Sequence, residues 1–237
     1  MPPTTFVAIL FLMRQCENNQ AVVSFKALLQ SDRIMTKIDF KKTLKHLYAP
    51  SAKDFALVDV PDMTFVMVDG HGAPGNDTYQ NALSWLYPVS YGLKFYSKQT
   101  LDKDYVVPPL EGLWWADDMT AYIDDRRDEW YWTMMIMLPD WLDDAAFAAS
   151  VEKAAKKLGE PPATLRREIL HEGLCAQIMH IGPYSEEGPT IAKLHKEFLP
   201  QNGLTENGHH HEIYLGDPRK TAPEKLRTVL RHPVRRL

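Results

Sequence analysis

Apolar and polar residues follow a strand pattern, then a helix pattern, then a strand pattern again in the first half of the chain. Apolar, β-branched runs bounded by turn residues predict four strands, at residues 55–60, 63–70, 105–116 and 130–138. Apolar residues at helical spacing predict a helix over residues 77–96. Pro88 lies inside that helix and lacks a backbone donor, so we expect the helix to kink or divide there.

The same order of patterns occurs again in the second half. Two helices are predicted, over residues 145–158 and 185–198. The predicted strands are residues 165–171, 174–181, 209–215 and 226–232. The order of elements therefore predicts an internal duplication, with half-repeats at about residues 55–140 and 143–235.

Local detail in the two halves supports this duplication. A turn with glycine and proline precedes a helix in each half, at Gly72-Ala73-Pro74 and at Gly182-Pro183-Tyr184. A strand with a lone glutamate follows each of these helices, with Glu111 in the first half and Glu212 in the second. The predicted fold is α+β, with two strand-helix-strand-strand units related by pseudo-twofold symmetry around a central ligand groove. Glu111 and Glu212 are expected to approach that groove from opposite sides.

The first 34 residues do not fit this pattern. We interpret residues 1–34 as a poorly ordered N-terminal extension upstream of the true start at Met35, and residues 35–237 as the domain. Phe6 to Met13 form a short apolar run in the extension. No Lys or Arg precedes this run and no clear small-residue cleavage site follows it, so a signal peptide is the less favoured alternative.

Charge and cysteine content argue against several classes of protein. The net charge is −4, whereas general nucleic-acid binding needs a basic face. The basic residues from Arg227 to Arg236 are interpreted as solvated charges at a chain end. Cys16 and Cys175 form no C-x-x-C pair, so we expect no disulfide framework and a cytoplasmic location. No apolar run reaches the roughly 18 residues of a membrane span.

Two motifs that suggest a cofactor fail in their context. Gly70-His71-Gly72-Ala73-Pro74-Gly75 matches the dinucleotide fingerprint, but no buried strand ending in an acidic residue follows at the required distance. His209, His210 and His211 are consecutive in a predicted strand, where neighbours point to opposite faces, so the three cannot converge on one metal ion. A site made from His210, Glu212 and a distant ligand is the alternative. Our prediction is that neither a metal nor a cofactor is bound.

Glu212 is the main candidate for chemistry. A carboxylate beside aromatic rings is costly to desolvate unless a partner or a reaction uses it, and strand alternation places Tyr214 on the same face as Glu212. The sequence also holds an aromatic cluster made of Trp114, Trp115, Trp130, Tyr131 and Trp132. Alternation divides this cluster between two faces, and the sequence leaves open which set lines the groove.

Each acidic candidate also has an alternative explanation. Glu212 is the acidic member of a predicted strand and would form a surface salt bridge if that strand lay at the sheet edge. The pair Glu186-Glu187 begins a predicted helix, so we attribute it to an exposed surface and to stabilisation by the helix dipole.

A set of short motifs resembles a known family. They are Asp39-Phe40-Lys41-Lys42, Pro108-Pro109-Leu110-Glu111-Gly112-Leu113-Trp114-Trp115, Trp130-Tyr131-Trp132-Thr133, Glu172-Gly173, His180-Ile181-Gly182-Pro183-Tyr184 and His210-His211-Glu212-Ile213-Tyr214-Leu215. Together they resemble the GyrI-like small-molecule-binding family over residues 35–237, and most of all its stand-alone branch described as cyclopropanoid hydrolases. The resemblance implies a duplicated fold with a central ligand groove and a pocket glutamate at Glu212. It also implies that a glutamate and aromatic residues direct water onto a strained ring. The DNA-binding helices that regulators attach to this fold are missing from the chain.

The resulting hypothesis is a cytoplasmic, metal-independent hydrolase that binds aromatic or multidrug-like small molecules and opens cyclopropanoid, DNA-alkylating electrophiles. Glu212 would be the general base, and Tyr184 and Tyr131 would donate to the carbonyl that gains charge. The predicted ligand-binding residues are Glu111, Trp114, Trp115, Trp130, Trp132 and Tyr214. The expected partner is a small molecule rather than nucleic acid or membrane, bound by a monomer or a homodimer.

The rival hypothesis is a binding module that sequesters lipophilic cations by charge pairing and cation–π attraction. Inhibition of a topoisomerase is a third hypothesis, which rests only on a relative's name.

Overall fold

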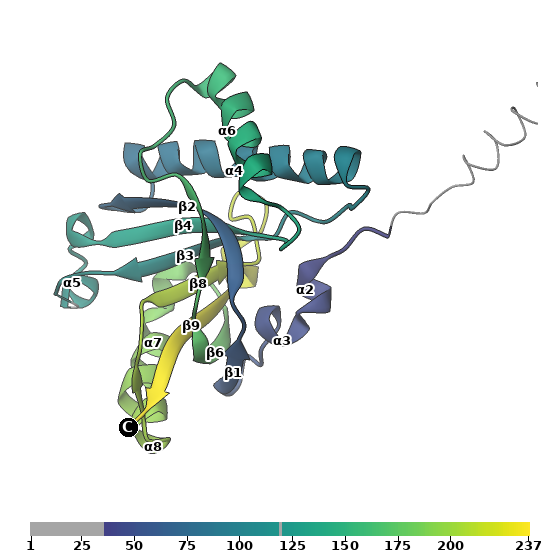
Figure 1. Cartoon of the computed structure of the whole chain (residues 1–237). Helices are drawn as coiled ribbons and strands as arrows, with labels where there is room; N and C mark the ends of the chain where they lie inside the picture. The colour runs from purple at the N-terminus through teal and green to yellow at the C-terminus, as the bar shows by residue number, and fades with distance from the viewer. Residues whose placement is uncertain (1–35, 119) are drawn as a thin grey trace, which may run out of the picture. The chain divides into compact units, whose positions relative to one another are not determined.

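The computed structural model describes residues 36–118 and 120–237 (Figure 1). The predictions for residues 1–34, for Met35 and for Cys16 lie outside these residues. The strands are β1 (Ala56–Val60), β2 (Met63–His71), β3 (Leu110–Trp115), β4 (Tyr131–Leu138), β5 (Arg166–Leu170), β6 (Gly173–Ile181), β7 (Leu204–Glu206), β8 (His210–Tyr214) and β9 (Arg227–Arg236). The helices are α2 (Phe40–Thr43), α3 (Lys45–Tyr48), α4 (Asp77–Thr100), α5 (Thr120–Ile123), α6 (Asp144–Leu158), α7 (Gly188–Lys193) and α8 (Leu199–Gln201).

Within the described residues, nine strands form one antiparallel sheet. Eight of them follow the order β1-β6-β9-β8-β3-β4-β2-β5, and β7 pairs with the end of β9. The first and second halves of the chain meet where β3 pairs with β8, with Gly112 opposite Glu212. Each half also gives its first strand to the other half, because β1 pairs with β6 and β5 pairs with β2.

The register of the strands shows the pseudo-twofold symmetry. Val58 lies opposite Cys175 in the pairing of β1 with β6, and Glu168 lies opposite Phe65 in the equivalent pairing of β5 with β2. The turns after β2 and β6 are equivalent too. The Gly72 N–H donates to the Trp130 carbonyl at 2.7 Å, and the Gly182 N–H donates to the Leu226 carbonyl at 3.1 Å. The two halves of the sheet are therefore built in the same way, and the symmetry axis passes between β3 and β8.

The sheet has two faces, which we call face A and face B. Face A carries Trp114 and Glu212, and face B carries Glu111 and Ile213, because neighbouring strand residues point to opposite sides. Helices α4 and α6 pack on the first half of face A, and the segment from α7 to α8 packs on its second half (Figure 1). The short helices α2 and α3 pack on face B, where Leu47 and Tyr48 are buried.

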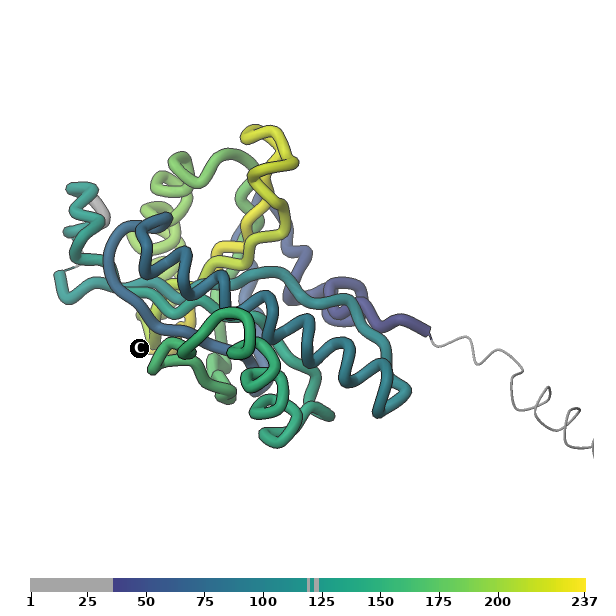
Figure 2. Tube along the Cα trace, turned by 90° about the horizontal axis from the view of Figure 1, so that it is seen from above, coloured from purple at the N-terminus to yellow at the C-terminus, as the bar shows by residue number. Residues whose placement is uncertain are grey.

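Helix α6 lies directly against α4, as Figures 1 and 2 both show. The Ser150 hydroxyl on α6 donates to the Val89 carbonyl on α4 at 2.8 Å. Gly92 makes this approach sterically feasible, because a Cβ there would lie 2.2 Å from the Ser150 Oγ. The two helices therefore cover the first half of face A as one closely packed layer.

The predicted elements occur, with four differences in their extent. Helix α4 runs through Pro88 from Asp77 to Thr100, so the predicted division does not occur. Strand β3 begins only at Leu110, because Pro108 and Pro109 cannot donate to a ladder. The predicted helix over 185–198 is divided into a 3₁₀ turn, α7 and a π-helical turn at Leu194–Phe198. Strand β9 continues past Pro233 to Arg236.

Candidate functional site

Two carboxyl groups meet on face A over the centre of the sheet. Glu212 comes from β8, and Glu187 comes from the turn before α7. Only 4% of Glu187 is exposed. Burial, the negative charge of Glu212 and a hydrogen bond with Glu212 raise the pKa of Glu187 to about 9. At neutral pH Glu187 is therefore protonated, and its hydroxyl donates to the Glu212 carboxylate.

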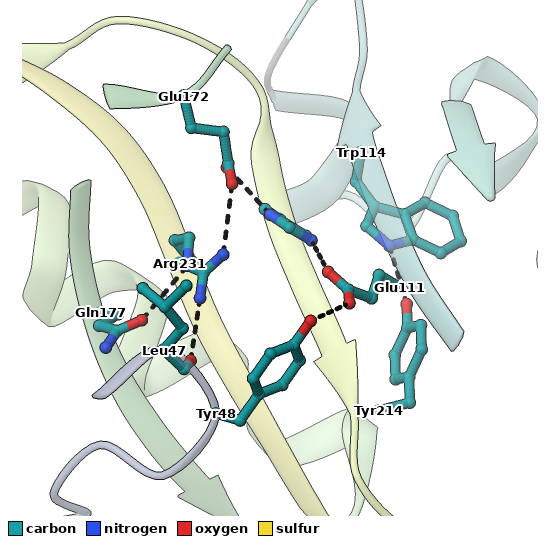
Figure 3. Close-up of polar contacts among 9 residues, drawn as sticks. Leu47, Tyr48, Glu111, Trp114, Glu172, Gln177, Tyr214 and Arg231 are labelled. Atoms are coloured by element: carbon teal, nitrogen blue, oxygen red, sulfur yellow. Dashed lines mark hydrogen bonds and ion pairs between the residues drawn. The ribbon is translucent and has the colours of Figure 1, made fainter. Parts of the chain in front are cut away.

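A tyrosine and a tryptophan extend this pair across the two central strands. The Tyr214 hydroxyl donates to Oε2 of Glu212 at 2.7 Å. It accepts from Nε1 of Trp114 at 2.9 Å (Figure 3). Gly112 on β3 leaves the room for this contact. A Cβ at Gly112 would lie 2.9 Å from the Trp114 Nε1 and 3.2 Å from the Tyr214 hydroxyl. The polar contacts on face A thus run from Trp114 through Tyr214 to Glu212.

Further tyrosines surround the carboxyl pair. The Tyr184 ring packs edge to face on the Tyr214 ring, with centroids 5.6 Å apart. Burial, followed by the charges of Glu187 and Glu212, raises the pKa of Tyr184 to about 12. Burial and the charge of Glu212 also raise the pKa of Tyr79, which comes from α4. These phenols stay protonated at neutral pH, so they can donate hydrogen bonds to a ligand.

A histidine touches Glu212 from its own strand. Nε2 of His210 lies 3.4 Å from Oε1 of Glu212. The His210 ring lies 6.0 Å from the His232 ring of β9, measured between centroids. Burial, followed by the neighbouring His210 and His195, lowers the pKa of His232 to about 3. His232 is therefore uncharged, and it adds a neutral imidazole ring to this side of the site.

Face B holds a separate, fully buried network of charges (Figure 3). Glu111, which is 1% exposed, accepts from the Tyr48 hydroxyl at 3.1 Å and from Nε2 of His211 at 3.0 Å. Nδ1 of His211 donates to Glu172 at 2.9 Å, and Arg231 donates to the other oxygen of Glu172 at 3.3 Å. Two carboxylates therefore face two cations, and the network is neutral as a whole.

The pKa values in this network follow from its charges. Burial alone would lower the pKa of His211, but the charge of Glu172 and hydrogen bonds to Glu111 and Glu172 raise it to about 9. Burial alone would raise the pKa of Glu172, but His211 and Arg231 lower it to about 2. Arg231 also donates to the Leu47 carbonyl at 2.9 Å. This network therefore fastens α3 to the sheet, which is a structural role.

The structure corrects several expectations about geometry and burial. Glu111 and Glu212 do not meet in one groove, because Gly112 rather than Glu111 lies opposite Glu212 and adjacent residues point to opposite faces. Under the symmetry, the residue equivalent to Glu111 is His211. Tyr131 lies opposite Trp115, on face B, so it cannot act on a ligand together with Glu212. Glu187 was expected at the surface and Arg231 was expected to be solvated, but both are buried.

The predicted site residues divide into three groups. Glu212, Tyr184, Tyr214 and Trp114 come together on face A, and Trp130 packs edge to face on Trp114 with centroids 6.1 Å apart. Trp115, Tyr131 and Glu111 lie on face B. Trp132 is fully buried in the core beneath α4, where its Nε1 donates to the Gly72 carbonyl at 3.2 Å. The role of Glu187 was not predicted, because a glutamate that begins a helix usually faces solvent.

The described residues show neither a metal-binding cluster nor a helix that could cross a membrane. Residues 36–118 and 120–237 contain no group of three or more His, Cys, Asp or Glu side chains placed to hold a metal ion. None of the helices in that part of the chain has the length and apolar character needed to cross a membrane.

Comparisons with known proteins give a consistent result. A family model, the GyrI-like small molecule binding domain, matches residues 53–235. The chain is 42% identical to an uncharacterized conserved protein from Listeria innocua, with a TM-score of 0.77 and coverage of 84% of this chain and 100% of that one. It is also 42% identical to a protein described as a hydrolase from Listeria innocua, with the same coverage and a TM-score of 0.73. The C-terminal domain of EcmrR is 12% identical over 78% of this chain and 98% of that one, with a TM-score of 0.51, and shares the fold. No curated protein matches the chain.

Proposed function

Because the chain belongs to the GyrI-like small-molecule-binding domain family, we propose that the carboxyl pair on face A binds an aromatic small molecule and hydrolyses it. The proposed substrate is a cyclopropanoid electrophile, a strained ring conjugated to a carbonyl, as in some DNA-alkylating compounds. Two Listeria proteins described as hydrolases are 40–42% identical to this chain, which supports hydrolysis but does not identify the substrate.

The buried contact between the carboxyl groups of Glu187 and Glu212 is the observation that carries this proposal. One carboxyl is protonated and its neighbour accepts from it and from Tyr214, so an acid and a base stand side by side at neutral pH. Hydrolysis with acid and base assistance needs both forms at the same time. Here the environment of the two carboxyl groups supplies both the protonated and the ionised form, so the proposed reaction uses neither a metal nor a covalent intermediate.

The reaction can be written with these groups in named roles. Glu212 takes a proton from water while the water oxygen forms a bond to a cyclopropane carbon. The carbon–carbon bond of the ring breaks, and its electron pair moves through the conjugated system to the carbonyl oxygen. Glu187 or Tyr184 gives a proton to that oxygen, and proton exchange with solvent restores both groups. The product is the substrate plus one water.

The aromatic residues around the pair would hold a flat substrate. Trp114, Tyr184 and Tyr214 present ring surfaces beside Glu212, and stacking and apolar burial favour planar ligands there. Trp130 packs edge to face against Trp114 and so restricts its orientation.

A sequestering module for lipophilic cations is the second candidate. The Glu212 carboxylate beside the Tyr184 and Tyr214 rings favours it, because charge pairing and cation–π attraction would hold a cation at the same place. A sequestering site prefers cationic ligands and releases them unchanged, whereas the hydrolase accepts neutral electrophiles and converts them.

Mass spectrometry of a cyclopropane-containing DNA-alkylating compound separates the two candidates. We expect wild type to form a product heavier by one water over many turnovers, and Glu212→Gln to lose turnover by about 100-fold or more. Glu186→Gln is the matched control, because Glu186 is the exposed neighbour of Glu187 and should retain full turnover. Compound that wild type leaves unchanged would reject the hydrolase. A cationic dye that binds wild type and is lost from Glu212→Gln would then support the sequestering module.

A further inference from the structure

Face B contains a cavity that the carboxyl pair on face A does not reach. Its volume is about 360 Å³, within the range of small-molecule sites. Leu113, Thr133 and Met67 form its floor on three central strands, and all three side chains are buried. Trp115 and Tyr131 border the cavity on one side, and Arg166 of the edge strand β5 borders it on the other. The cavity therefore has a buried floor and two walls of different chemistry.

One wall belongs to a row of aromatic rings, of which Tyr131, Trp115 and His209 line the cavity. His71, Tyr131, Trp115 and His209 lie at one level of the sheet, on neighbouring strands or, for His209, directly before β8. Tyr131 and Trp115 are nearly parallel, with centroids 5.9 Å apart and planes 16° apart. Trp115 and His209 are stacked with centroids 4.2 Å apart and planes 18° apart. Trp115 and Tyr131 thus border the cavity in nearly the same orientation, and a planar ligand can pack against both.

The other wall carries an excess of negative charge. Arg166 donates to Asp69 at 2.7 Å and also pairs with Glu168, so one cation faces two carboxylates. Burial lowers the pKa of His209, which therefore adds no positive charge at neutral pH. Glu168 is half exposed and can turn a carboxylate oxygen toward a bound cation. The charged wall is complementary to a cation, and the ring wall is complementary to a flat aromatic surface.

From these two walls we infer that the cavity on face B is a second ligand site, for planar aromatic cations. The inference is independent of the hydrolase, because the carboxyl pair and this cavity lie on opposite faces of the sheet and share no side chain. It also gives a function to Trp115 and Tyr131, which the sequence singled out and the site on face A does not use.

Adjacent tryptophans allow both faces to be observed in one experiment. Trp114 reports on face A through its bond with Tyr214, and Trp115 reports on face B. We would record the ¹⁵N–¹H signals of the indole N–H groups during titration with berberine, a planar cation, and assign the Trp115 signal with Trp115→Phe. The expected result is a saturable shift of the Trp115 signal that persists in Glu212→Gln.

Two further variants test the two walls. Tyr131→Leu should weaken berberine binding at this site by about ten-fold, in line with the loss of one stacked ring near a cation. Glu168→Gln should weaken berberine several-fold without affecting oxyberberine, which has the same rings and no charge. Glu168 is exposed, so its substitution leaves the fold intact. A titration that shifts only Trp114, or neither signal, would overturn the inference. Equal affinity for berberine in wild type and both variants would overturn it as well.

Discussion

Glu111 offers the sharpest test of the buried network on face B. Glu111→Gln keeps the shape of the side chain and removes one negative charge, so no cavity forms. The amide can still accept from Tyr48, but the charged contact with His211 at 3.0 Å is lost. Hydrogen bonds to charged groups contribute about 1.5–3 kcal/mol, and breaking a buried ion pair costs about 3–5 kcal/mol. His211 keeps its contact with Glu172, so we expect a loss of about 3 kcal/mol in the free energy of unfolding.

The pKa of His211 reflects its interactions with Glu172 and Glu111 together. It is raised to about 9 in the folded protein, against about 6.5 for an unfolded chain, and this difference corresponds to about 3 kcal/mol of stability. That contribution is fully present below about pH 6.5, where both states are protonated. It is lost as the pH rises toward 9, because the folded state alone must keep the proton. Glu111→Gln should therefore flatten the fall in stability between about pH 6.5 and 9.

Urea unfolding followed by tryptophan fluorescence at several pH values measures both effects. Glu168→Gln is the matched control, because Glu168 also pairs with a cation, Arg166, but with half of its side chain exposed. Exposed pairs contribute less than about 1 kcal/mol, so the control should change little at any pH. A loss in Glu111→Gln that equals the loss in Glu168→Gln would refute the view that this network holds α3 on the sheet.

Two further predictions concern face A. Since Glu187 has a pKa of about 9 when folded and about 4.3 when unfolded, it makes stability fall as the pH rises between these values, at up to about 1.4 kcal/mol per pH unit. Glu187→Gln should remove this dependence of stability on pH, measured by urea unfolding at pH 5, 7 and 9, whereas Glu186→Gln should keep it. The same dependence in Glu187→Gln as in wild type would contradict the buried pair. Gly112→Ala should destabilise the fold by about 1–3 kcal/mol, because its Cβ would lie 2.5 Å from the Met134 Cε and 2.9 Å from the Trp114 Nε1. Gly188→Ala, which meets nothing within 4 Å, is the control in the same thermal melts, and equal melting temperatures for the two variants would count against the close contact.

Much of the fold could be predicted from local pattern, because strand periodicity and turn residues fix where elements lie. Alternation also separated Trp114 from Trp115 correctly. Pairing Glu111 with Glu212 failed because matching residue types across the two halves is not the same as matching register. A shift of one residue moves a side chain to the other face.

The role of Glu187 could not be read from its surroundings in sequence. A glutamate at the start of a helix usually faces solvent and is stabilised by the dipole. Here the turn before α7 folds over β8, and the resulting burial beside Glu212 depends on residues 25 positions apart in the chain. Only the assembled sheet brings these two carboxyls together.

The exchange of β1 and β5 between the halves has a consequence for biosynthesis. When β1 leaves the ribosome, its partner β6 has not yet been made, and the delay is on the order of ten seconds at usual rates of synthesis. Strand β9 lies between β6 and β8, so the second half of the sheet stays discontinuous until β9 has been translated. The second half of the sheet cannot form before β9 is made, and until then β6 and β8 each carry an unpaired edge. We therefore expect the yield of this protein to depend on the chaperones that bind emerging chains.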